Sequence, residues 1–147
     1  MPVEPTVDYS AVVTKEGKFT LAEFPDCPGC QTFVEGGESI ETMAADALNG
    51  WLVSNLGRGI SPPRPGSVPI AKGAKVISVS VEPGLAIRIE LRWAREDAKL
   101  TQAGLARAVG ITQQQVAKLE AADSNPTIDT LDRVAKGLGR KLHVSLG

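Results

Sequence analysis

Residues 100–120 read LTQAGLARAVGITQQQVAKLE, and this stretch decides the fold of the C-terminal half of the chain. Thr101 and Thr112 each stand where a side-chain hydroxyl can cap the N-terminus of a helix. Gln115 lies three residues after Thr112 and completes a T-x-x-Q capping box. Gly110 falls between the two segments, where a helix often ends in the left-handed conformation that glycine adopts at little cost. The pattern predicts two short helices joined by a tight turn, a helix-turn-helix.

The outward face of the second helix carries side chains that can bind DNA, because the apolar positions Val116 and Leu119 direct the opposite face inward. A glutamine amide can bond both N6 and N7 of adenine in the major groove, and Lys118 can contact a phosphate. Glutamines are also good solvated helix formers, and a QQQ run alone would indicate no more than that. Within a helix-turn-helix, we predict contact with double-stranded DNA. The predicted contact residues are Gln102, Thr112, Gln113, Gln114, Gln115, Ala117 and Lys118.

The same stretch resembles the Cro and phage-repressor class of helix-turn-helix domains through T-Q-x-x-L-A-x-x-x-G-I-T-Q-Q-x-V-x-x-L-E. Gly104 is a departure, because such domains usually carry Glu there. Glycine inside a helix costs about 1 kcal/mol relative to alanine, and the first helix also loses the reciprocal half of a capping box. The resemblance implies that Arg95 pairs with Glu120 at the end of the recognition helix. The alternative is that these two residues are independent surface charges.

Residues 140–146, RKLHVSL, alternate apolar and polar side chains and predict a half-buried strand. No neighbouring strand is expected in this helical half, so the strand would be an edge without a partner. The simplest partner is the same strand of a second chain, joined through Leu142, Val144 and Leu146. A homodimer would also match two operator half-sites, and whether dimers pair into tetramers is left open.

The N-terminal half predicts an α+β layer in the order β-β-β-α-β. The helix begins after Ser39, and its apolar residues from Ile40 to Leu56 recur at spacings that bury one face. Residues 60–73 contain four prolines and predict an extended loop. Pro83-Gly84 marks the expected junction between a domain of residues 1–82 and one of residues 83–147. The expected strands cover residues 9–13, 18–24, 30–34 and 74–81.

Cys27 and Cys30 form a C-x-x-C pair in a predicted turn. Such a pair acts in redox chemistry when a helix begins at the first cysteine and lowers its thiol pKa, but the residues that follow predict a strand. Zinc needs about four ligands, and the chain adds only the distant His143 to the two cysteines. We therefore expect free cysteines and no metal or other cofactor.

The formal net charge of −1 hides an asymmetry between the two halves. Residues 1–84 carry 6 basic and 10 acidic side chains, whereas residues 85–147 carry 10 basic and 7 acidic. The basic half holds the DNA-binding pattern, and the acidic half suits a basic protein partner. The N-terminus, MPVEPTVDYS, lacks the basic and apolar regions of a signal peptide, and no apolar run approaches the roughly 18 residues of a membrane span. We expect a cytoplasmic protein without a membrane partner.

The N-terminal half resembles HicB-type antitoxins over about residues 8–82. The resemblance rests on Y-S-A-V-V, a hairpin with a glycine, F-P-D-C-P-G-C, G-E-S-I-E-T-M-A and the proline-rich loop, and F-P-D-x-P-G-C is its most specific part. It implies a partly degraded RNase H-like fold without nuclease activity. It also implies binding to a small basic ribonuclease toxin of the HicA type, for which Phe24, Pro25, Asp26 and Cys30 are the predicted contacts.

Three hypotheses follow for the whole chain. The first is an antitoxin that neutralises a HicA-type toxin and represses its own operon. The second is a stand-alone transcriptional repressor whose N-terminal domain senses a small ligand; a buried polar pocket would favour it, and an exposed groove or acidic patch would favour the toxin. The third is a metal-dependent nuclease, which needs clustered carboxylates. Asp8, Glu23 and Asp26 have no spacing that marks such a site.

Overall fold

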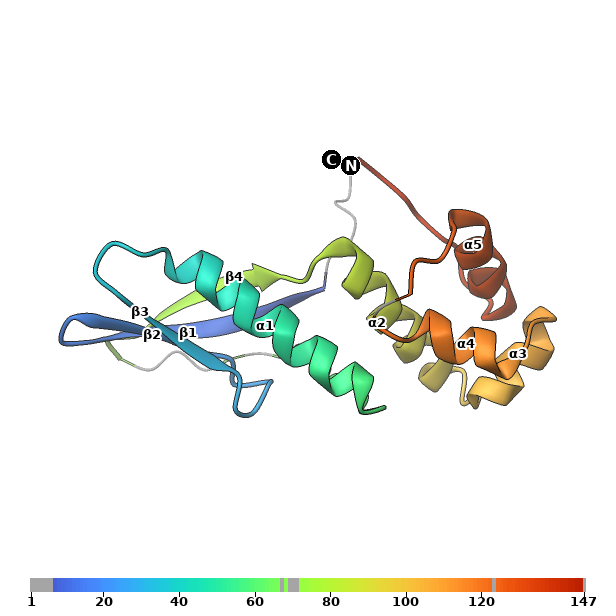
Figure 1. Cartoon of the computed structure of the whole chain (residues 1–147), viewed down its shortest axis with the longest axis horizontal. Helices are drawn as coiled ribbons and strands as arrows, with labels where there is room; N and C mark the ends of the chain where they lie inside the picture. The colour runs from blue at the N-terminus through green and yellow to red at the C-terminus, as the bar shows by residue number, and fades with distance from the viewer. Residues whose placement is uncertain (1–6, 67, 69–71, 123, 147) are drawn as a thin grey trace.

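The structure, a computed structural model, describes residues 7–66, 68, 72–122 and 124–146. A sheet with one helix lies at one end of the molecule and a group of short helices at the other (Figure 1). Residues 1–6 and Pro69, on which part of the signal-peptide and loop expectations rest, lie outside the described residues. The elements are β1 (Asp8–Glu16), β2 (Phe19–Glu23), β3 (Gln31–Glu35), α1 (Ile40–Gly57), β4 (Lys75–Ser80), α2 (Pro83–Asp97), α3 (Gln102–Val109), α4 (Gln113–Leu119) and α5 (Ile128–Gly137).

The N-terminal part is a four-stranded antiparallel sheet in the order β3-β2-β1-β4, which confirms the predicted β-β-β-α-β succession. Gly17 closes the first hairpin with a φ of 63°, a conformation that side chains with a Cβ rarely adopt. Ser39 caps α1 by accepting a hydrogen bond from the Thr42 backbone nitrogen at 3.2 Å. The helix lies across one face of the sheet and covers it. The buried side chains between the two layers include Tyr9, Ala11, Ala22, Leu48 and Leu52.

The C-terminal part has the predicted helix-turn-helix in α3 and α4, with α5 packed against them. Gly110 ends α3 in the left-handed conformation at a φ of 80°. These three helices and α2 share a second apolar core. Its buried residues are Leu91, Leu105, Ala106, Val116, Leu119, Leu131 and Val134. None of the described helices is both long and apolar enough to cross a membrane.

Helix α2 belongs to both parts of the molecule. Pro83 and Gly84, expected at the domain junction, form its first turn. Leu85 and Ile89 are buried in the core beneath the sheet, whereas Leu91 is buried in the core of the C-terminal helices. The division into residues 1–82 and 83–147 therefore stays a proposal, because one continuous helix supplies side chains to both cores.

The structure differs from the expectation of a strand at residues 140–146, which have no regular secondary structure. A strand needs a hydrogen-bonded neighbour, and the described part of this single chain places none beside this segment. Leu142 packs against the second core, while Val144 and Leu146 are 65% and 99% exposed. The predicted half-buried strand is therefore not formed in the single chain, and pairing with a second chain stays a prediction. The RNase H-like relationship of the sheet also stays a prediction.

Candidate nucleic-acid interface

Helix α4 is held at its N-terminus by the capping box that the sequence predicts. The Thr112 hydroxyl accepts a hydrogen bond from the Gln115 backbone nitrogen at 3.1 Å, and the Gln115 side-chain oxygen accepts one from the Thr112 backbone nitrogen at 2.8 Å. The cap therefore occupies the amide oxygen of Gln115. Because a bidentate contact to adenine needs both the oxygen and the nitrogen of the amide, Gln115 is less suited to it than Gln113 and Gln114.

The two faces of α4 differ in burial as expected for a recognition helix. Val116 and Leu119 are buried in the second core. The remaining residues face solvent. They present amides, one small side chain and one ammonium group that a binding partner could contact. The exposed predicted contacts are Thr112, Gln113, Gln114, Gln115, Ala117 and Lys118.

Glu120, the residue that caps the C-terminus of α4, forms the ion pair with Arg95 that the resemblance implies. The Nε atom of Arg95 donates to Oε2 of Glu120 at 2.6 Å, and its Nη2 atom donates to Oε1 at 2.9 Å. Both residues are buried, and Nη1 of Arg95 donates to the backbone oxygen of Leu100 at 2.9 Å. The hydrogen bonds to Glu120 raise the pKa of the Arg95 guanidinium further above its ordinary value. The pair therefore fixes the end of the recognition helix to α2.

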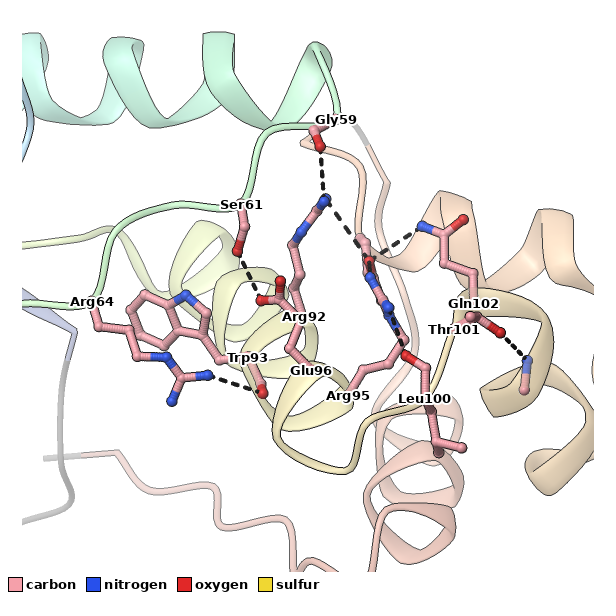
Figure 2. A network of polar contacts seen from close by, with 12 residues as sticks. Gly59, Ser61, Arg64, Arg92, Trp93, Arg95, Glu96, Leu100, Thr101 and Gln102 are labelled. Carbon is pink, nitrogen blue, oxygen red and sulfur yellow. Dashed lines mark hydrogen bonds and ion pairs between the residues drawn. The ribbon is translucent and has the colours of Figure 1, made fainter.

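Gln102 is directed toward this ion pair rather than left at the surface (Figure 2). Its amide nitrogen donates to Oε1 of Glu120 at 3.2 Å, and the residue is partly buried. This bond uses one of the two N–H donors of the amide and leaves the other for a phosphate, so the predicted DNA contact of Gln102 stays a prediction. The sequence placed Gln102 correctly at the start of α3 and did not show that its side chain supports the ion pair.

Two further arginines of α2 bond the segments that follow α4 and α1. Arg88 donates to the Ser124 hydroxyl at 3.1 Å and to the Ala122 backbone oxygen at 2.9 Å. Arg92 donates to the backbone oxygen of Gly59 at 2.8 Å, and another of its nitrogens lies 4.0 Å from Glu120. Sequence reasoning missed both roles, although Arg88 and Arg92 lie seven and three residues before Arg95, spacings that place all three on one face of a helix.

A cleft of about 500 Å³ lies between α4 and α5 and is lined in part by Gln115. Its lining includes Lys118, Arg133 and the hydroxyl-bearing residue Thr127, which caps α5. Cationic and hydroxyl groups are the usual phosphate contacts of DNA-binding proteins. Arg133 was absent from the predicted contacts because it comes from a third helix, outside the helix-turn-helix pattern.

The structure corrects two of the four predicted toxin contacts in the N-terminal half. Phe24 and Cys30 are only 2% and 4% exposed, so neither side chain offers a contact surface. The reason is the turn itself, in which the Phe24 nitrogen bonds the Cys30 oxygen at 3.1 Å and the apolar side chains enter the first core. Pro25 is exposed, and Asp26 accepts a hydrogen bond from the Gly66 nitrogen at 3.0 Å.

The two thiols are free, as the sequence predicts for this C-x-x-C, and both are buried, which the sequence did not predict. Burial raises the pKa of Cys27 to about 12, with smaller contributions from Cys30 and Asp26 nearby, and burial raises the pKa of Cys30 to about 11. Neither group is a thiolate at neutral pH. Across the described part of the chain, no three His, Cys, Asp or Glu side chains come together in a way that could hold a metal ion.

Comparison with known proteins gives similarities to both halves. A family model described as helix-turn-helix, HTH_3, matches residues 91–144. The chain is 30% identical over 132 residues to Antitoxin HicB 1 of Photorhabdus laumondii subsp. laumondii, an alignment that covers 90% of this chain and 81% of that protein. A chain of a solved HicA3 and HicB3 toxin-antitoxin complex aligns with a TM-score of 0.45 and 21% identity, and the alignment covers 52% of this chain and 99% of that one.

We expect Arg95→Ala to lower the free energy of unfolding by about 3 kcal/mol, because the variant leaves the buried Glu120 carboxylate without its main partner. Urea unfolding followed by circular dichroism measures the change. Lys136→Ala is the matched control, since it removes an exposed ion pair with Asp132 and should leave stability nearly unchanged. Equal losses of unfolding free energy in the two variants would show that the buried pair stabilises the fold no more than an exposed pair does.

We expect Cys27 and Cys30 to react with Ellman's reagent at pH 8 at least about 100-fold more slowly in the folded protein than in urea. Their raised pKa values leave almost no thiolate at that pH, and burial also limits access. The rate in the folded state should increase as the pH rises toward 11. A thiol that reacts rapidly at pH 7 in the folded protein would contradict this assignment and revive a redox role.

Proposed function

This chain belongs to the HicB family of antitoxins, and from that premise we propose that it neutralises a HicA-type ribonuclease toxin and represses its own operon. The N-terminal α+β part would bind the toxin, and the helix-turn-helix would bind double-stranded operator DNA. The observation that carries the proposal is the extent of the similarity to Antitoxin HicB 1, because 132 aligned residues include both parts of the chain. The match of residues 91–144 to a helix-turn-helix family supports the second role independently.

The DNA-binding role would rest on the first turn of α4. Gln113 and Gln114 are exposed there, and their amides have the donor and acceptor that adenine requires in the major groove. Lys118 and Arg133 line the adjoining cleft and would contact phosphates. A homodimer would present two copies of α4 to a palindromic operator, and the exposed side chains of Val144 and Leu146 are available for its interface.

The antitoxin role is supported by the charge and shape of the N-terminal half. Residues 1–84 carry four more acidic than basic side chains, which would attract a small basic toxin. The hollow found in this half is open and lies on the outer face of the sheet, lined by Glu16, Phe19, Leu21 and Phe33. An exposed hollow of this kind favours a protein partner over the alternative of a repressor that encloses a small ligand.

Expression of the tagged chain together with its neighbouring genes tests the two roles at once. We expect a small basic protein, toxic when expressed alone, to co-purify with the chain. The double variant Gln113→Ala/Gln114→Ala should retain this protein but lose roughly 100-fold in operator affinity, because two amide contacts to bases are removed. A gel-shift assay measures the DNA affinity, and the residual non-specific binding should keep its dependence on salt.

Ser54→Ala is the control, since it makes a similar change at an exposed position of α1 in the other half of the chain. It should leave operator affinity unchanged. Loss of the co-purifying protein in the glutamine variant would refute the division of roles between the two parts. Operator binding with no co-purifying protein would instead support the ligand-sensing repressor.

Deletion of residues 140–147 should yield a monomer with much weaker operator binding, because it removes the proposed interface. Leu146→Asp is the milder variant, since it leaves Leu142 packed against the second core. Ser145→Asp is its control, because it adds the same charge on the opposite side of the alternating segment. Sedimentation velocity measures the assembly. A truncated protein that remains dimeric would rule out pairing through this segment.

A further inference from the structure

The outer face of the N-terminal sheet is left open by the described helices, because α1 lies across the other face (Figure 1). Side chains alternate between the two faces along each strand. The strand register therefore places Thr14, Leu21 and Phe33 in one row across β1, β2 and β3 on the outer face. Glu16, Phe19 and Glu35 form the adjacent row.

Two aromatic rings lie side by side on this outer face, one on β2 and the other on the edge strand β3. Phe19 and Phe33 meet edge to face, with ring centroids 5.6 Å apart and an interplanar angle of 89°. Their side chains are 36% and 62% exposed, although both are large and apolar. Rigid aromatic side chains of this kind often provide most of the binding energy at protein interfaces.

A hollow of about 260 Å³ lies beside the two rings and is lined by Glu16, Phe19, Leu21 and Phe33. Three of the four lining side chains are apolar, and the hollow is open to solvent. Its size suits one apolar side chain from a partner rather than an enclosed small ligand. A partner with a projecting apolar residue would therefore fill it.

The rim of the hollow is acidic. Glu16, Glu23 and Glu35 are exposed on the outer face, and Lys18 is the nearby cation. The Lys18 ammonium lies 2.9 Å from the Glu35 carboxylate and 5.5 Å from the Phe19 ring centroid. Glu16 and Glu23 make no ion pair with any described residue. Their carboxylates are therefore available to a basic partner.

We propose that this outer sheet face, centred on Phe19, Leu21 and Phe33, is the surface on which the basic toxin docks. An apolar side chain of the toxin enters the hollow, and lysine or arginine residues beside it contact Glu16 and Glu23. The inference rests on the proposed antitoxin function and names the surface that performs it. It places the toxin on the opposite side of the sheet from α1, away from the buried side chains of Phe24 and Cys30.

The solvent face of α1 is another exposed surface of this half, and it is less suited to the toxin. Its exposed apolar residues, Met43 and Val53, are ten positions apart, which separates them by about 15 Å along the helix axis. Neither is aromatic, whereas the sheet face combines an aromatic pair with a hollow beside it. Val53, which is 44% exposed, therefore provides a matched control position.

The test measures the dissociation constant between the full-length chain and the co-purified toxin by isothermal titration calorimetry. Phe33→Lys should weaken binding at least 100-fold, because it removes an aromatic contact and adds a charge that repels a basic partner. Phe33→Thr, which keeps a residue suited to a strand, should weaken binding at least tenfold. Glu16→Lys/Glu23→Lys should weaken binding about tenfold and reduce its dependence on salt. Val53→Lys should bind within twofold of the unchanged protein.

Operator affinity and the thermal midpoint of each variant establish that it is folded. One outcome is that the wild-type protein binds the toxin while Phe33→Lys binds it with a dissociation constant within threefold of the wild-type value. That result would overturn the docking surface and leave the proposed function standing. The same result with an altered sedimentation coefficient of the antitoxin would assign this face to contact between two copies of the chain. Wild-type protein that binds no toxin would overturn the proposed function as well.

Discussion

The position of the recognition helix depends on the buried ion pair between Arg95 and Glu120. Removing two charges from water is costly, and the attraction between them offsets that cost only with good geometry and further hydrogen bonds. Here both carboxylate oxygens accept from the guanidinium, and Oε1 also accepts from the Gln102 amide. The remaining guanidinium nitrogen donates to Leu100, just before α3 begins. A single pair therefore joins α2, the start of α3 and the end of α4, and the exposed glutamines depend on it for their orientation.

Helix α2, which provides Arg95, also forms hydrogen bonds with the segment that follows α1, at the sheet end of the molecule (Figure 2). Trp93 donates from its indole nitrogen to the Pro62 oxygen at 3.0 Å. Arg64 lies over the Trp93 ring and forms an ion pair with Asp97 at 2.7 Å. Arg92 adds a bond to the oxygen of Gly59. Because Arg92, Trp93 and Asp97 lie on α2 together with Arg95, one helix rather than a free linker joins the helix-turn-helix to the sheet end of the molecule.

The sequence predicts those features that depend on residues close together along the chain. The capping box of α4, the left-handed Gly110 and the β-β-β-α-β order all follow from spacings of a few residues, and the ion pair follows from the resemblance to repressors. The expected strand at residues 140–146 was wrong for the single chain because a strand is defined by a neighbour, which alternation cannot supply. Phe24 was predicted as a toxin contact because it belongs to the F-P-D-x-P-G-C motif. A sequence motif does not reveal whether its side chains face solvent. Phe33 was missed because alternation divides a strand into two faces without showing which of them a helix will cover.

The acidic rim of the outer sheet face has a second physical consequence. An exposed aromatic pair near an edge strand would favour pairing between copies of the same chain, since β3 also presents unpaired backbone groups. Two copies brought together through this face would bring two acidic surfaces into one interface, and like charges at close range are unfavourable. A basic partner meets the same carboxylates with opposite charge. The same carboxylates therefore attract a basic partner and oppose self-association. Charge, and not apolar area alone, determines which partner binds this surface.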